Sequence, residues 1–224
     1  MLAVDTTELA RIFRSEVDDP LRDTCIDDDC LWKNIDVYGY MTEAVDAVMR
    51  GVGGVGGQVS VPYLADQSTV VLPKKVYQAT SAWLADGKRL RIISQAEAGF
   101  DRNFEGQPLD FSKRDVPDTL MAELGYTQVV LYPTPADAGT VTVLGRFTLG
   151  MPLMEGMPLP LREIADQRLV LTYMKARAYS KHDAETYDLG RAQAYQNEFD
   201  MRLMDREVEL RRNRRPPGAV RMDW

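Results

Sequence analysis

One stretch decides the fold: Pro160–Arg215, which reads PLREIADQRLVLTYMKARAYSKHDAETYDLGRAQAYQNEFDMRLMDREVELRRNRR. It is the longest part of the chain without an internal proline, and its only glycine is Gly190. Ala, Leu, Arg, Met, Glu and Gln dominate it, and all are strong helix formers. The polar run Ser180-Lys-His-Asp183 interrupts the pattern and offers Asp183 as an N-cap. The stretch therefore predicts two long helices joined by a short connection.

Each of these two helices has an apolar face, because apolar residues recur at steps of three and four. The face of the first consists of Ala165, Leu169, Thr172, Ala176 and Tyr179. The face of the second is looser and consists of Tyr187, Ala192, Tyr195, Phe199, Leu203 and Leu210. Pro216-Pro217-Gly218 ends the second helix. We expect a rigid scaffold here and not a pocket.

Two shorter helices are predicted nearer the start of the chain. Asp5-Thr-Thr-Glu8 is a capping-box pattern with Asp5 as the N-cap, and an apolar stripe follows it. After an acidic, irregular stretch, a second helix ends at Gly51. Its apolar positions fit a helical period: Val37, Tyr40, Met41, Ala44, Val45 and Val48.

Between residues 58 and 149 the periodicity changes to that of strands. Asp86-Gly87 lies between Val76–Leu84 and Lys88–Ile93, which predicts a β-hairpin. Thr127–Tyr132 and Thr140–Leu144 are expected to form a second strand pair. A short helical patch is expected at residues 118–124.

The predicted fold class is therefore α+β, with a helical bundle body, long C-terminal helices, an inserted antiparallel β domain and an extended C-terminal tail. We expect the helical body to comprise residues 1–50 and 158–212. The inserted β-rich domain is expected at residues 51–157, and the tail at residues 213–224.

The glycine run Gly51–Gly57 contains the pattern G-x-G-x-x-G. A dinucleotide-binding site needs a strand before these glycines and a helix after them. Here a helix precedes them and a strand is expected to follow. The order of elements therefore favours a hinge or a tight crossover over a cofactor site.

Composition excludes several classes of protein. The chain has 45% hydrophobic and 27% charged residues, which is typical of a soluble globular protein. The net charge of −7 argues against nonspecific nucleic-acid binding by the whole surface. No apolar run approaches the roughly 18 residues of a membrane span, and no signal peptide is recognisable. Cys25 and Cys30 lie in an acidic loop; whether they pair is left open, with reduced thiols expected.

Residues for catalysis or metal binding do not form a recognisable set. His182 is the only histidine, and with Cys25 and Cys30 it cannot complete a zinc site. No serine lies in a G-x-S-x-G elbow, and there is no P-loop. Asp27–Asp29 lacks the glycine and spaced glutamate of a calcium loop, which favours a solvated loop or an electrostatic contact. We therefore predict no enzyme, with no catalytic residues, no cofactor and no metal.

The C-terminal segment is strongly basic and ends in tryptophan. Three interpretations are open: a solvated terminus, an anchor into another protein, or a contact with nucleic-acid phosphates. Trp and Arg are enriched at binding hot spots, which favours the anchor. The candidate partner-binding residues are Arg211, Arg212, Arg214, Arg215, Arg221 and Trp224.

Several motifs together resemble a known family. They are the helix from Leu31-Trp32 to Arg50, Val71-Leu-Pro-Lys-Lys-Val-Tyr77, Lys88-Arg-Leu90, Leu131-Tyr-Pro-Thr-Pro-Ala-Asp137, Leu159-Pro-Leu-Arg-Glu163, Leu169–Tyr179, and Tyr187–Arg212 with its basic tail. In this order they resemble the head-to-tail adaptor, or connector, proteins of tailed bacteriophages. The resemblance covers nearly the whole chain.

The resemblance implies a non-enzymatic virion component at the head–tail junction, present in the host cytoplasm during assembly. It implies a homo-oligomeric, dodecameric ring that binds the portal protein and a tail tube or nozzle protein, and that continues the channel for genomic DNA. It further implies that the C-terminal segment reaches along the portal. The alternative that the residues leave open is a small nucleic-acid-binding or regulatory module acting through its basic tail.

Overall fold

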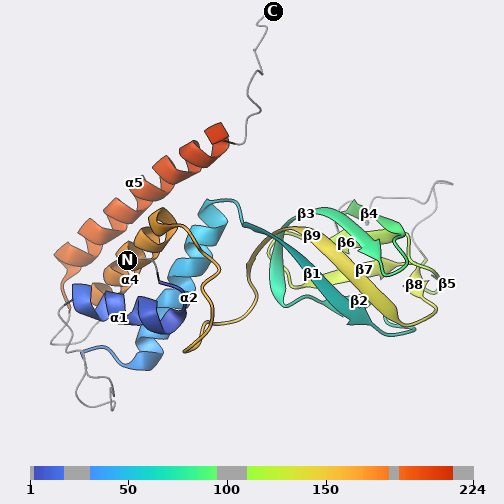
Figure 1. Cartoon of the computed structure of the whole chain (residues 1–224), viewed down its shortest axis with the longest axis horizontal. Helices are drawn as coiled ribbons and strands as arrows, with labels where there is room; N and C mark the ends of the chain where they lie inside the picture. Colours follow the sequence, from blue (N-terminus) through green and yellow to red (C-terminus); the bar gives the residue numbers. More distant parts are fainter. Residues whose placement is uncertain (1–2, 18–30, 95–109, 182–186, 214–224) are drawn as a thin grey trace, which may run out of the picture. The chain divides into compact units, whose positions relative to one another are not determined.

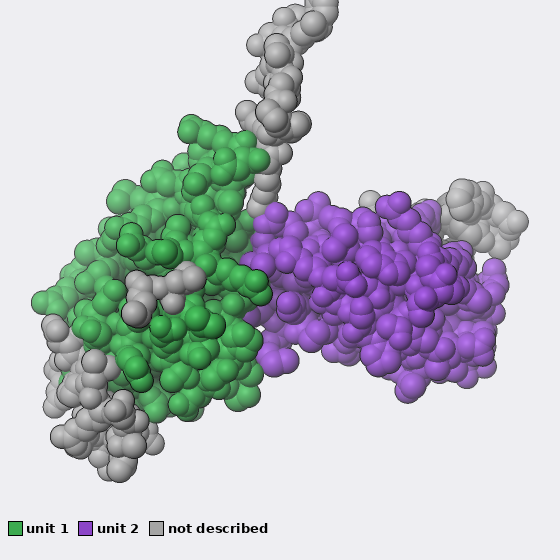
Figure 2. All heavy atoms as spheres, in the orientation of Figure 1, with its two compact units in different colours: residues 1–53, 152–224 green, residues 54–151 purple. Residues whose placement is uncertain are grey.

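The computed structural model describes residues 3–17, 31–94, 110–181 and 187–213 (Figure 1). The chain divides into two compact units (Figure 2). We call Met1–Gly53 with Pro152–Trp224 the helical unit, and Gly54–Met151 the strand unit. Helices make up the first unit and a large, mostly antiparallel sheet the second, which confirms the predicted α+β class.

The first helices of the helical unit are α1 (Thr6–Glu16) and α2 (Asn34–Gly51). The Asp5 carboxylate accepts the Glu8 N–H at 2.9 Å, as the capping box predicts. The Glu8 carboxylate reaches back and accepts the N–H of Val4, also at 2.9 Å. Both predicted helices are therefore present, and local sequence rules account for the start of α1.

The helix α4 (Ile164–Ser180) lies at the centre of the helical unit. It packs against α1, α2 and α5 (Leu189–Asn213). The single apolar face predicted for it is too narrow, and Ala165 in that face is exposed. Buried side chains surround the helix, including Val170, Leu171, Met174 and Ala178. Leu169, Thr172 and Ala176 of the predicted face are buried, so the prediction was incomplete, because a helix with neighbours on three sides buries more than one stripe.

The helix α5 begins at Leu189, and Asp188 caps it. The Asp188 carboxylate accepts the Arg191 N–H at 3.0 Å, and the Asp188 carbonyl accepts the Ala192 N–H at 2.9 Å. The predicted N-cap, Asp183, lies outside the described residues. The residue that caps α5 is thus Asp188, five residues after the predicted Asp183.

The strand unit contains a seven-stranded sheet in the order β1-β9-β3-β4-β6-β7-β2. The pair β4–β6 is parallel, and the other pairs are antiparallel. A second, two-stranded sheet pairs β5 (Arg114–Asp115) with β8 (Thr134–Pro135) in parallel. The strands of the larger sheet are β1 (Val55–Tyr63), β2 (Thr69–Val71), β3 (Lys74–Leu84), β4 (Arg89–Ile93), β6 (Thr119–Ala122), β7 (Gln128–Tyr132) and β9 (Gly139–Leu149).

The predicted hairpin is confirmed: β3 and β4 pair at Ala82↔Leu90 and Trp83↔Arg89, across the turn at Gly87. The predicted pairing of β7 with β9 is wrong. β9 lies between β1 and β3, whereas β7 lies between β6 and β2. β9 has eleven residues, so it can pair along most of its length with two strands of nine and eleven residues.

The predicted helical patch at residues 118–124 is also wrong, because Thr119–Ala122 form β6. Thr119, Leu120 and Met121 are buried between β4 and β7. Burial in the sheet overrides the helix propensity of Leu, Met and Ala.

The predicted order of elements around the glycine run Gly51–Gly57 is confirmed. The helix α2 precedes it and β1 follows it, an order opposite to that of a dinucleotide site. Gly53 and Gly54 have φ of 75° and 77°, in the left-handed region that favours glycine. Gly56 and Gly57 are part of β1 and not of a loop. A hinge in this run stays a prediction.

Candidate assembly interface on α4 and α5

The buried face of α5 contains one polar residue among apolar ones. Ala192 and Phe199 are buried, and Tyr195, Leu203 and Leu210 are partly buried, as predicted, whereas Tyr187 of the predicted face precedes α5 and is exposed. Arg206 lies in the same face, three residues after Leu203 and four before Leu210, and it is buried as well. Sequence reasoning missed Arg206, although an arginine at an apolar position of the helical period was a usable signal.

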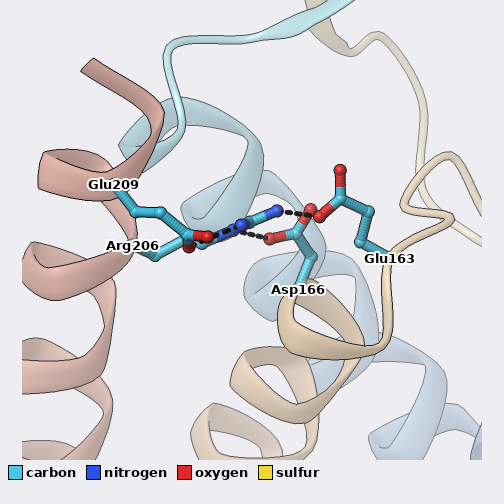
Figure 3. A network of polar contacts seen from close by, with 4 residues as sticks. All are labelled: Glu163, Asp166, Arg206 and Glu209. Carbon is cyan, nitrogen blue, oxygen red and sulfur yellow. Dashed lines mark hydrogen bonds and ion pairs between the residues drawn. The ribbon is translucent and has the colours of Figure 1, made fainter. Parts of the chain in front are cut away.

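Arg206 binds three carboxylates (Figure 3). Its Nε donates to Asp166 Oδ1 at 2.8 Å, and its NH1 donates to Glu209 Oε2 at 2.7 Å. Its NH2 donates to Glu163. The Arg206 and Asp166 side chains are 9% and 11% exposed, so their mutual attraction is screened less by water than that of a surface pair.

The hydrogen bond that Arg206 donates to Asp166 is the main cause that raises the pKa of Arg206 above its ordinary value. The guanidinium is therefore charged at all pH values at which the protein is folded. Glu163 and Asp166 belong to the start of α4, and Arg206 to the last third of α5. The network, which we call the Arg206 cluster, fixes the C-terminal part of α5 against the beginning of α4.

A chain of aromatic rings joins the other ends of these helices. The ring centroids of Phe13 and Trp32 are 6.0 Å apart, and those of Trp32 and Tyr179 are 5.9 Å apart, both in edge-to-face geometry. Tyr179 stacks on Tyr195 at 5.9 Å. The Trp32 indole N–H donates to the Ala178 carbonyl at 3.2 Å. These contacts connect α1, the residues before α2, α4 and α5 by geometry that aromatic pairs prefer.

Ion pairs join α4 to the first two helices. Lys175 contacts Glu16 of α1 at 2.7 Å, and Lys181, just after α4, contacts Asp36 of α2 at 2.7 Å. Arg177 contacts Glu43 of α2 at 2.8 Å. Such partly exposed pairs contribute at most about 1 kcal/mol each. The Arg206 cluster and the aromatic chain therefore account for more of the rigidity of this scaffold.

The opposite face of α5 is apolar and exposed. Met201, Met204 and Val208 are 66%, 69% and 40% exposed. They recur at steps of three and four residues, so they share one side of the helix. At 100° per residue this side is opposite Phe199 and Arg206. We call these three residues the outer stripe.

A groove of about 430 Å³ lies elsewhere on the helical unit, between α2 and residues 152–155. Burial raises the pKa of the Tyr38 phenol in this groove, and the nearby Glu155 carboxylate raises it further. We call it the α2 groove; its lining residues are Asn34, Ile35, Tyr38, Gly39, Thr42, Pro152, Leu153, Met154 and Glu155.

Only two of the predicted partner-binding residues belong to the described part of the chain. Arg211 and Arg212 are exposed in the last turn of α5, and Arg211 contacts Glu207 at 2.6 Å. Arg214, Arg215, Arg221 and Trp224 lie outside the described residues. The same holds for Cys25, Cys30, Asp27–Asp29 and His182.

No group of three His, Cys, Asp or Glu side chains suited to a metal ion occurs among residues 3–17, 31–94, 110–181 and 187–213. Within the same ranges, each helix is too short or too polar to span a bilayer.

Comparison with known proteins gives one clear relationship. No curated protein matches the chain. A protein-family model described as SU10 adaptor protein matches residues 7–222, which include both units and every helix and strand except the first residue of α1. This match spans almost the entire sequence and agrees with the resemblance drawn from its motifs. The chain therefore belongs to the SU10 adaptor protein family and is a head-to-tail adaptor of a bacteriophage.

Proposed function

We propose that this adaptor joins the portal of the phage head to the tail as a homo-oligomeric ring. The observation that carries the proposal is the family match over residues 7–222. A ring subunit must present two different faces to its two neighbours on elements that hold their shape. The α4–α5 scaffold, held by the Arg206 cluster and the aromatic chain, supports this role.

In this proposal twelve copies form the ring, and the ring continues the channel for genomic DNA. The protein carries a net charge of −7. An acidic wall repels phosphates, so a duplex slides past it without sequence-specific binding. The role is structural, without catalysis and without a cofactor.

The C-terminal segment is the proposed portal contact. Arg211 and Arg212 end α5 on exposed positions, and the sequence continues with further arginines and Trp224. A rigid helix that ends in basic residues delivers them at a fixed place relative to the body. Arg211, Arg212, Arg214, Arg215, Arg221 and Trp224 are therefore proposed to bind the portal or a tail protein.

The test measures the mass of the purified chain in solution, alone and with the portal ring of the same phage. We expect a small species alone and a large complex with the portal. Removal of residues 214–224 should abolish the complex while the circular dichroism spectrum of the helices is retained. A full-length chain that never joins the portal, even at low salt, contradicts the proposal.

The alternative of a nucleic-acid-binding module makes the opposite prediction for the same two chains. The full-length chain would bind duplex DNA with a steep salt dependence, and the shortened chain would not. Under the adaptor proposal, both chains bind DNA equally weakly.

A further inference from the structure

The outer stripe of α5 is an apolar surface that the helix does not need for its own packing. Its buried face already provides the contacts to α4, including Phe199, whose ring lies 4.9 Å from that of Tyr173 in edge-to-face geometry. Met201 and Met204 are nonetheless about two-thirds exposed. Methionine is flexible and polarisable, and it is common at surfaces that bind other helices. These side chains lie on one side of the helix, so together they form a continuous apolar surface that a partner could cover.

The α2 groove has the features of a helix-docking surface. Four of its residues, Ile35, Tyr38, Gly39 and Thr42, follow the steps of three and four that define one helix face. Ile35 is 79% exposed in this groove. A Cβ added at Gly39 would meet nothing within 4 Å.

Gly39 is informative because it lies inside a helix, where glycine costs about 1 kcal/mol relative to alanine. A clash within the same copy does not explain why glycine occupies this position, since an alanine side chain would fit there. A residue without a side chain does allow the axis of another helix to approach α2 closely. Gly39 therefore leaves room for a second helix to pack across this position.

The outer stripe and the α2 groove have the same length and carry charges of opposite sign. Met201 to Val208 and Ile35 to Thr42 each span seven helical steps, about 10.5 Å. Arg212 follows Val208 by four residues and continues the outer stripe. Within the described part of the chain, neither Arg212 nor Glu155 of the α2 groove forms an ion pair, so each surface offers one unpaired charge of opposite sign.

We propose that the outer stripe of one copy docks in the α2 groove of a second copy, with Arg212 of the first against Glu155 of the second. In this arrangement Arg212 contacts the neighbouring copy, and the other basic residues of the C-terminal segment remain available to the portal. The occupant of the groove is thus α5 of the same protein. The two surfaces differ, so the contact is head-to-tail, and its repetition produces a closed ring or an open chain. The proposal rests on the proposed function, because it names the surfaces that join ring neighbours.

One such contact is small. Three side chains in a groove bury much less than the ~800 Å² per partner of a stable interface. We therefore expect monomers in dilute solution. Copies held side by side on a portal experience an effective concentration near ~1 mM, at which a weak contact forms.

The test uses thiol crosslinking of the full-length chain with a short bismaleimide. Ile35→Cys and Met204→Cys are combined in a chain that also carries Cys25→Ser and Cys30→Ser. A crosslink within one copy is excluded by geometry. A Cβ at Gly51 would lie 2.6 Å from Leu203, and Ile35 lies sixteen residues, about 24 Å, before Gly51 on α2.

The reaction is run on the concentrated free chain and on the chain bound to the portal. The proposal predicts a ladder of dimers, trimers and larger species with both cysteines, and no crosslinks with either cysteine alone. Dimers formed by Met204→Cys alone would show that α5 pairs with α5, which overturns the proposal. Absence of the ladder in both samples also overturns it, whereas a portal complex without a ladder leaves the proposed function intact.

Four further variants report on the contact itself, measured by light scattering of the concentrated free chain without introduced cysteines. Gly39→Leu fills the groove and should abolish association, whereas Gly39→Ala adds one carbon and should weaken association less than Gly39→Leu, with a more stable helix. Glu155→Arg should weaken association, and the pair Glu155→Arg with Arg212→Glu should restore it. An undiminished association of Gly39→Leu, or a failure of the charge exchange to restore it, contradicts the proposal.

Discussion

The two units of this adaptor are stabilised by different kinds of interior. The strand unit encloses a cluster of apolar side chains, with Leu120, Leu131, Val143 and Phe147 at or below 1% exposure. The helical unit buries charge and amide groups as well, among them the Arg206–Asp166 pair. Another is Gln167, whose amide exchanges hydrogen bonds of 2.9 and 2.7 Å with the backbone of Ala3.

The difference shows that the hydrophobic pattern of the sequence predicts the interior of the strand unit better than that of the helical unit. In β1 and β7 burial alternates along the strand, so alternation predicts the core there, whereas β6 and β9 bury consecutive residues. In the helical unit, several elements are joined by polar pairs whose partners lie far apart in sequence. Three comparisons of stability test this contrast between an apolar interior and a partly polar one. They are given from the largest expected effect to the smallest.

The largest effect is expected in the apolar core. Phe147→Ala should lower the free energy of unfolding by about 4 kcal/mol, because it removes a fully buried ring and leaves a cavity. Hydrogen exchange should accelerate in β1, β3 and β9. Leu144→Ala, at an exposed position of the same strand, is the control and should change little. An equal loss of protection in α4 would show that the units are not separable in stability.

The next effect concerns the Arg206 cluster. Arg206→Ala should destabilise by about 3 kcal/mol, since it leaves the Asp166 carboxylate buried without its partner. The faster exchange should appear in α5 and at the start of α4.

The matched control is Arg202→Ala on the same helix. Its exposed pair with Glu198 is expected to contribute at most about 0.5 kcal/mol. Combining Arg206→Met with Asp166→Leu should recover most of the lost stability, because a packed apolar pair replaces an ion pair. If Arg206→Ala has no greater effect than Arg202→Ala, the contrast between the units disappears.

The smallest effect tests a local rule within the helical unit. Asp5→Ala should cost about 1 kcal/mol, because the Glu8 N–H loses its acceptor at the start of α1. Asp5→Asn retains an acceptor, so its free energy of unfolding should be close to that of the original protein. Both variants are measured by chemical denaturation, and in a separate experiment by hydrogen exchange of α1. A stable Asp5→Ala chain would mean that packing of Phe13 alone positions α1.

Local rules predicted most of the elements but not how they are joined. The cap at Asp5, the end of α2 at Gly51 and the β3–β4 hairpin follow from short patterns. The wrong pairing of β7 with β9 has a physical cause: strand neighbours depend on contacts across the whole sheet, which short patterns do not encode.

The candidate interface was less accessible to sequence reasoning. The sequence indicated the basic end of α5, whereas the outer stripe was not recognised because its methionines alternate with charged residues. Arg206 was overlooked because its three partners lie three, forty and forty-three residues away. The α2 groove requires two segments more than one hundred residues apart, Asn34–Thr42 and Pro152–Glu155. No single stretch of sequence contains that information.

The central position of α4 has a consequence for how such adaptors diverge. α4 packs against neighbours on three sides and exposes few of its side chains, among them Arg168 and Arg177, so selection on it concerns mainly packing. α5 shares that constraint on one face only, and its outer face meets the α2 groove of a neighbouring copy in the proposed ring. Among related phages we expect α4 to conserve side-chain size, and we expect the outer face of α5 to vary together with the α2 groove, so that the contact between copies changes without refolding of the body.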